Sequence, residues 1–188
     1  MLAMIAGLVL FLGVHMVTTA RATRAALMAR FGEGAYKGLY SIVSAVGLVL
    51  IVWGFGRYRS SGYIPVWDPP SGLLPIPLVL MWFSFVALVA AYAPTGKIKG
   101  LLRHPMLVGV KAWALAHLLA NGDLGSIILF GALLAWAVYD RIAVKRRGDN
   151  GAPRSGFTAG DAISLLAGSA LYAAMFWLHP RLIGVPIV

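Results

Sequence analysis

Long apolar stretches, separated by short polar and basic segments, constrain the fold of this 188-residue chain more than any other feature. A transmembrane helix needs about 20 consecutive apolar residues, and the sequence predicts six such helices. Their ranges are about 1–19, 36–56, 74–93, 105–120, 123–143 and 160–179. Only 12% of the residues are charged, too few for a soluble domain of this size. We therefore expect an all-α integral membrane bundle in which residues 1–188 form a single transmembrane domain.

The connections between these stretches are rich in turn-forming residues. Residues 60–77 carry several prolines and glycines, Asn121-Gly122-Asp123 predicts a tight helix hairpin, and residues 148–156 predict a polar turn. The first apolar stretch lacks the basic leader of a cleaved signal peptide, so we expect it to be retained as a helix. The stretch 105–120 is the shortest and contains Lys111.

Two further segments have recognisable helical patterns. Residues 21–31 (RATRAALMARF) are Arg-rich and amphipathic, which predicts that they continue the first helix and lie at the cytoplasmic interface. Gly160, Ser164 and Gly168 recur every fourth residue in the last apolar stretch. A stripe of small residues lets a second helix approach closely, so we expect a helix-packing seam there.

The net charge of +10 is distributed unevenly over the predicted loops. One side of the six-helix topology carries Arg21, Arg24, Arg30, Lys37, Lys97, Lys99, Arg103, Arg141, Lys145, Arg146, Arg147 and Arg154. The other side carries Arg57, Arg59 and Arg181. Basic loops face the cytoplasm, so we expect a multi-pass protein of the bacterial inner membrane with both termini in the periplasm. The basic loops would bind anionic lipid headgroups, and no nucleic-acid partner is expected.

The reactive residues narrow the possible chemistry. The chain has no cysteine, which excludes disulfides, thiolate-ligated metals and iron–sulfur clusters. All six carboxylates fall in loops or at the ends of the predicted helices, whereas ion-coupled transporters normally place one at membrane depth. The histidines are therefore the residues on which a functional hypothesis rests.

His15 and His117 lie within apolar stretches, where an imidazole costs free energy unless a partner satisfies it. Two histidines on separate membrane helices are the minimum set that holds a metal or a haem iron from both sides. His104 lies in Arg103-His104-Pro105, where Pro105 predicts the start of a helix. His179 lies at the end of the last stretch, where an interfacial position explains it.

Several longer segments resemble a known family. They are GVHMVTTARATRAALMARFGEGAYKGLYSIVS, WGFGRY with GYIPVW, LLRHPMLVGVKAWALAHLLANGDLGSIILFG and YDRIAVKRR. These segments resemble the NnrU family of bacterial membrane proteins, which is similar to the plant 15-cis-ζ-carotene isomerases. The resemblance covers nearly the whole chain.

The resemblance implies a haem b cofactor with His15 and His117 as the axial ligands of its iron. Two positions depart from the isomerases: Ala114 replaces a cysteine beside the second ligand, and Gly56 replaces a histidine before Arg57-Tyr58. Both departures weaken the transfer of isomerase activity. The two ligand positions are retained.

The haem propionates would need cationic partners, for which Lys111, Arg21 and Arg103 are candidates. At about 1.5 Å per residue, His15 lies about 9 Å from Arg21 and His117 about 20 Å from Arg103. This difference in depth leaves His104 open as an alternative second ligand. The resemblance favours His117.

Arg103-His104-Pro105-Met106-Leu107-Val108-Gly109 is also similar to the RHPxYxG segment of small membrane methyltransferases that use S-adenosylmethionine. Leu107 stands where that pattern has tyrosine.

Three functions therefore stay open. The first is a haem-b protein of NnrU type that assists nitrite and nitric oxide metabolism in denitrification. The others are a haem-dependent cis–trans isomerase of a polyene such as ζ-carotene and a membrane methyltransferase. The ligand would be nitric oxide or a small apolar substrate, and a second copy or another membrane protein stays open as a partner.

Overall fold

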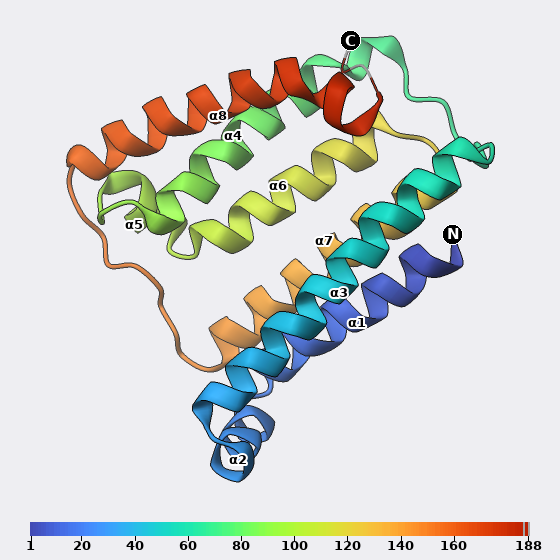
Figure 1. Cartoon of the computed structure of the whole chain (residues 1–188). Helices are drawn as coiled ribbons and strands as arrows, with labels where there is room; N and C mark the ends of the chain where they lie inside the picture. The colour runs from blue at the N-terminus through green and yellow to red at the C-terminus, as the bar shows by residue number, and fades with distance from the viewer. Residues whose placement is uncertain (186, 188) are drawn as a thin grey trace. The chain divides into compact units, whose positions relative to one another are not determined.

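The computed structural model describes residues 1–185 and 187, and these residues form α-helices joined by turns and loops (Figure 1). The elements are α1 (Leu2–Thr19), α2 (Arg21–Phe31), α3 (Glu33–Ser60), the 3₁₀ turn η1 (Ser71–Leu73), α4 (Pro75–Tyr92), α5 (Lys97–Leu102), α6 (Pro105–Ala120), α7 (Leu124–Arg146) and α8 (Ala159–Ile183). The all-α fold class is confirmed. Residues 21–31 are helical, as expected, but they form a helix of their own and do not continue the first one, because the chain turns at Ala20 with φ of −81° and ψ of 82°.

Five of the described helices (α1, α3, α4, α7 and α8) are long and apolar enough to cross a membrane. In each of them only 11% to 28% of the most apolar 18-residue window is buried. Apolar side chains exposed over whole helices need a hydrocarbon surrounding, so the protein is membrane-embedded and contacts lipid. The helix predicted over 105–120 is present as α6, and with 16 residues it is the shortest of the six.

The chain divides into two compact units, each described by itself. The first comprises residues 1–66 and 123–132, and the second comprises residues 67–122 and 133–188. Helix α7 therefore contributes its first residues to one unit and its remainder to the other.

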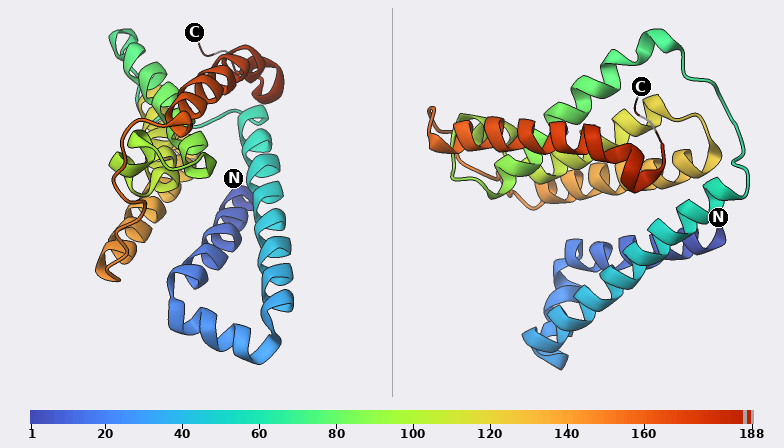
Figure 2. Two further views of the ribbon diagram at one scale, coloured as in Figure 1. Left: turned by 90° about the vertical axis from the view of Figure 1, so that its left-hand side faces the viewer. Right: turned by 45° about the horizontal axis from the view of Figure 1, so that its top comes forward.

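In the first unit α1 packs against α3 along a line of glycines. A Cβ atom added to Gly7 would lie 2.7 Å from the carbonyl oxygen of Gly47, and one added to Gly54 would collide with the backbone of Met4. The two helix backbones approach closely because these residues have no side chain. Helix α2 runs between the far ends of α1 and α3, so the three helices form the sides of a triangle (Figure 2). Gly32, with φ of +83°, provides the left-handed backbone that joins α2 to α3.

The end of α3 is fixed to the start of α7 within the same unit. The buried Tyr58 hydroxyl accepts a 2.9 Å hydrogen bond from the backbone of Ile64, whose carbonyl accepts one of 2.9 Å from Leu124. Asp123 caps α7, because its carboxylate accepts from the backbone N–H and the hydroxyl of Ser126 at 2.9 and 2.6 Å.

In the second unit α4 packs against α6 and α8 (Figure 1). The predicted seam is confirmed: Gly160 and Gly168 face the α4 side, where added Cβ atoms would collide with the Pro94 carbonyl and lie 2.7 Å from the Val86 Cα atom. Ser84 of α4 donates a 2.8 Å hydrogen bond to the Gly109 carbonyl of α6.

Asp161 joins the starts of two helices in this unit. Its carboxylate accepts backbone hydrogen bonds from Lys97 and Ile98 at the start of α5 and from Thr158 at the N-cap of α8, at 3.0, 2.7 and 2.8 Å. The side chain of Thr158 in turn accepts from Gly160, so a capping box starts α8. Asp161 is only 4% exposed.

Candidate functional site

His15 lies in the last part of α1 and is half-buried. Its Nδ1 atom is 2.6 Å from the carbonyl oxygen of Phe11, four residues earlier. The Phe11 ring lies 4.2 Å from the imidazole and the Tyr40 ring of α3 lies 5.4 Å from it, measured between centroids. A carbonyl oxygen only accepts hydrogen bonds, so Nδ1 of the neutral imidazole carries the hydrogen and Nε2 carries the lone pair.

His117 has the same local arrangement in the last turn of α6. Its Nδ1 atom is 2.9 Å from the carbonyl oxygen of Trp113, four residues earlier, and the two ring centroids are 5.1 Å apart. The carbonyl of His117 accepts a 2.8 Å hydrogen bond from the Asn121 side chain, which closes the end of the helix. The neutral imidazole therefore again carries its lone pair on Nε2.

The two histidines thus share a tautomer, a helical carbonyl partner and an aromatic neighbour. Histidines that ligate a metal normally donate the other ring N–H to a carbonyl or carboxylate, which fixes the orientation of the ring. The sequence carries a signal for this similarity that the apolar pattern alone misses. An aromatic residue precedes each histidine by four positions, in FLGVH (11–15) and in WALAH (113–117).

The chemistry of these donors fits a haem iron better than a bare metal ion. Among residues 1–185 and 187, no group of three or more His, Cys, Asp or Glu residues could hold a metal ion. A structural or catalytic ion bound by protein alone usually takes at least three ligands from protein side chains. Haem supplies four nitrogens of its own, so two neutral imidazoles complete the coordination of its iron. His15 and His117 are of the right type and in the right tautomer for that role.

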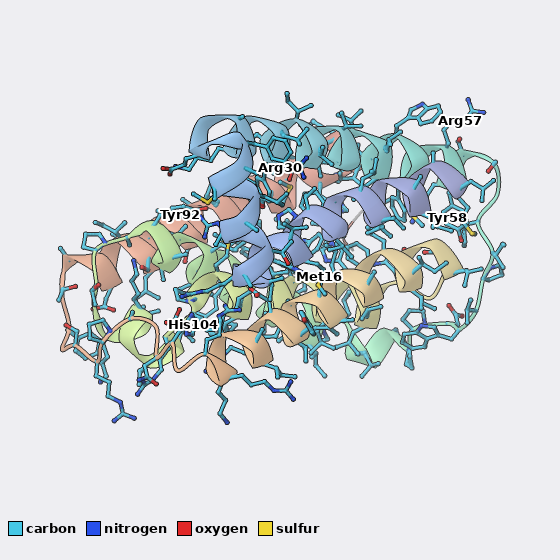
Figure 3. All side chains as sticks on the ribbon, turned by 90° about the horizontal axis from the view of Figure 1, so that it is seen from below. Met16, Arg30, Arg57, Tyr58, Tyr92 and His104 are labelled. Carbon is cyan, nitrogen blue, oxygen red and sulfur yellow. The ribbon has the colours of Figure 1, made fainter. Side chains whose placement is uncertain are left out.

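His104 has a different environment at the N-cap of α6. Its Nε2 atom, not Nδ1, is the bonded nitrogen: it lies 3.2 Å from the carbonyl oxygen of Asp149 and 3.9 Å from the Oδ1 atom of that residue. Figure 3 shows His104 beside the loop that follows α7. The imidazole of His104 therefore holds this loop against the start of α6.

Arg103 also contacts the loop that follows α7. Its backbone adopts φ of +60°, which is uncommon for a residue other than glycine. The guanidinium donates a 3.2 Å hydrogen bond to the carbonyl of Asn150, and the Arg103 carbonyl accepts one of 2.9 Å from Ala152. Arg103 thus has a structural role in this loop beside its candidate role as a propionate partner.

Lys111 and Arg21 are the other two candidate cations. Lys111 is half-buried in the middle of α6, and Arg21 is exposed at the start of α2. In the described part of the chain neither forms an ion pair with a carboxylate. A lysine at membrane depth needs an anionic or polar partner, so both cations are available to an anionic ligand.

His179 lies near the end of α8, and its Nδ1 atom is 2.8 Å from the carbonyl oxygen of Val185. The imidazole thereby ties the residues that follow α8 back to the helix. This contact accounts for His179 without a ligand.

Comparison with known proteins identifies the family. The sequence model described as NnrU protein matches residues 3–187, nearly the whole chain. No curated protein and no solved structure matches the chain. The match extends over all eight helices, including the segments around His15 and His117. The protein therefore belongs to the NnrU family.

Proposed function

We propose that this NnrU protein binds haem b within the membrane and uses His15 and His117 as the axial ligands. The observation that supports this proposal best is the matched geometry of the two imidazoles. Each places Nδ1 near the carbonyl oxygen four residues earlier, at 2.6 and 2.9 Å, so the neutral ring carries its lone pair on Nε2, the tautomer that ligation of the iron through Nε2 would need.

The surrounding residues suit an apolar cofactor with anionic side groups. Phe11, Tyr40 and Trp113 put aromatic rings next to the imidazoles, where they limit rotation of each ligand and exclude water. Lys111 and Arg21 would bind the propionates, since a lysine within the membrane needs a negative partner. When bound, haem would supply a redox-active iron centre, and nitric oxide would bind to it only by displacing one of the two histidines.

The function that fits this cofactor and the family is support of nitrite and nitric oxide metabolism in denitrification. The protein would act in the bacterial cytoplasmic membrane with both termini in the periplasm, because the basic residues concentrate on one side of a six-helix topology. Helix α6 is the fourth crossing in this topology. Its 16 residues extend about 24 Å, somewhat less than the roughly 30 Å hydrocarbon core.

Optical spectroscopy of the purified protein tests the cofactor. We expect a low-spin haem b spectrum in the reduced state, and His15→Ala and His117→Ala are each expected to abolish it or convert it to a high-spin form. His179→Ala is the matched control, because the imidazole of His179 is bonded to the end of the chain, and it is expected to leave the spectrum unchanged. Protein that stays colourless after reconstitution with haem would contradict the proposal, and binding of S-adenosylmethionine would then be the next assay.

A further inference from the structure

The first unit contains an apolar pocket, and one of its lining residues, Tyr40, is also the ring neighbour of His15. The cavity has a volume of about 400 Å³ and lies at the end of the α1–α3 pair that α2 connects. Its lining comes from all three helices and includes Val14 and Val17 of α1, Leu27 and Phe31 of α2, and Tyr36 and Val43 of α3. His15 is not part of the lining, and the lining contains no metal ligand of the His, Cys, Asp or Glu type.

Two arginines of α2, Arg24 and Arg30, flank this pocket. Arg24 precedes the lining residue Leu27 by three positions, so the two lie on the same side of α2. The guanidinium of Arg30 lies 5.3 Å from the ring centroid of the lining residue Phe31 (Figure 3 labels Arg30). Neither arginine forms an ion pair among residues 1–185 and 187. Glu33, at the start of α3, is bound to Lys37 at 2.6 Å, and the pKa of its carboxyl is lowered mainly by Lys37 and only to a smaller extent by Arg24.

A hydrogen-bonding group of the pocket also lacks a partner. The hydroxyl of Tyr36 is shielded from solvent and forms no hydrogen bond within the described residues. A buried hydroxyl without a partner costs free energy. Tyr36 lines the pocket, so a ligand there that carried an oxygen acceptor would remove this cost.

The pocket has the dimensions and polarity of a lipid tail site. Its lining on α3 runs from Ala35 to Val43, which is about 12 Å along the helix axis and most of the depth of one bilayer leaflet. The amphipathic helix α2, with three arginines and no acidic residue, lies across the end of this path. Basic residues at that level attract anionic headgroups.

We propose that this pocket binds one acyl chain of an anionic glycerophospholipid whose phosphate contacts Arg24 and Arg30. The ester region of the lipid then lies near the Tyr36 hydroxyl and accepts its hydrogen bond. The two proposals share Tyr40 but are tested separately, because lipid is measured by mass and haem by absorbance.

Native mass spectrometry of the full chain, released from nanodiscs of phosphatidylglycerol and phosphatidylcholine, tests the proposal. We expect one retained lipid per chain, with a preference for phosphatidylglycerol. Arg24→Gln combined with Arg30→Gln is expected to weaken that binding about tenfold or more, since each basic residue near an anionic lipid contributes on the order of fivefold. Lys145→Gln combined with Arg146→Gln removes the same charge from exposed positions of α7 and is expected to change nothing.

A second pair of variants tests the pocket itself. Ala35→Phe fills the pocket and is expected to abolish retention of the lipid, whereas Ala45→Phe, at an exposed position of the same helix outside the lining, is expected to keep it. Arg24→Lys with Arg30→Lys keeps the charge and is expected to retain most of the binding, which separates charge from folding. Equal retention of both lipids would overturn the proposal. Loss of haem absorbance in Ala35→Phe with an unchanged lipid count would also overturn it.

Discussion

The carboxylate of Asp161 accepts a 2.7 Å hydrogen bond from the backbone N–H of Ile98, 63 residues earlier in the chain. The same side chain accepts from Lys97 and from Thr158, so one buried carboxylate satisfies the first N–H groups of two helices. A carboxylate at a helix N-terminus also interacts favourably with the helix dipole. Asp161 therefore determines where α5 lies relative to the start of α8 within the second unit.

Replacement of Asp161 by alanine is expected to destabilise the protein by about 2–4 kcal/mol, because it leaves several buried N–H groups without an acceptor. Asp161→Asn keeps one oxygen acceptor and is expected to cost less. Thermal unfolding in detergent measures both effects. Asp68→Ala, at an exposed loop position, is the control and is expected to unfold like the unchanged protein. Equal stability of Asp161→Ala and Asp68→Ala would show that the hydrogen bonds of Asp161 to the starts of α5 and α8 contribute little to the free energy of unfolding.

The apolar pattern predicted which segments are helical but not how far each helix extends. The prediction for the second apolar stretch was 36–56, whereas α3 runs from Glu33 to Ser60. The extra turns are polar and leave no apolar signal, yet Glu33 at the start and Arg57 and Arg59 at the end interact favourably with the helix dipole. Helix ends of this kind are set by local electrostatics.

Helix α5 could not be predicted for a different reason. Its six residues (KIKGLL) are too few to show a helical period, and the acceptor for its first N–H groups is Asp161. A cap contributed from so distant a position in the chain exists only once the fold has formed. The division into two compact units likewise has no counterpart in the apolar pattern.

At the candidate site the sequence predicted the residue types but not their hydrogen bonds. An imidazole in an apolar stretch indicates that a partner is needed, and only the helix geometry shows that the carbonyls of Phe11 and Trp113 supply one. The same geometry separates His117 from His104, whose Nε2 atom contacts Asp149. The Tyr36 hydroxyl was missed, because a tyrosine near a helix start is usually explained by the membrane interface.

The topology of the chain is the second prediction. Because α6 is shorter than the other five apolar helices, the number of crossings depends on it. Its packing against α4, including the 2.8 Å hydrogen bond from Ser84 to Gly109, favours a crossing within the bundle. A reporter fused to the C-terminus is therefore expected to behave as periplasmic, as is one fused to the N-terminus. Cytoplasmic activity of the C-terminal reporter alone would mean that the chain crosses five times and that α6 does not span.

The last prediction concerns the choice of the second haem ligand. The bond from Nδ1 of His117 to the Trp113 carbonyl puts the lone pair of the neutral ring on Nε2, whereas the bonded nitrogen of His104 is Nε2 itself, which holds the loop after α7. His104→Ala is therefore expected to keep the low-spin haem spectrum and to lower thermal stability slightly, by about 1 kcal/mol for one partly exposed hydrogen bond. His117→Ala is expected to lose the spectrum or turn it high-spin while the fold is retained, as judged by circular dichroism. Asp149→Ala removes the carboxylate near His104 and is expected to resemble the unchanged protein spectroscopically. If His104→Ala abolishes the spectrum and His117→Ala spares it, the ligand pair is His15 with His104, and the similar depth of those two residues outweighs the hydrogen-bond geometry.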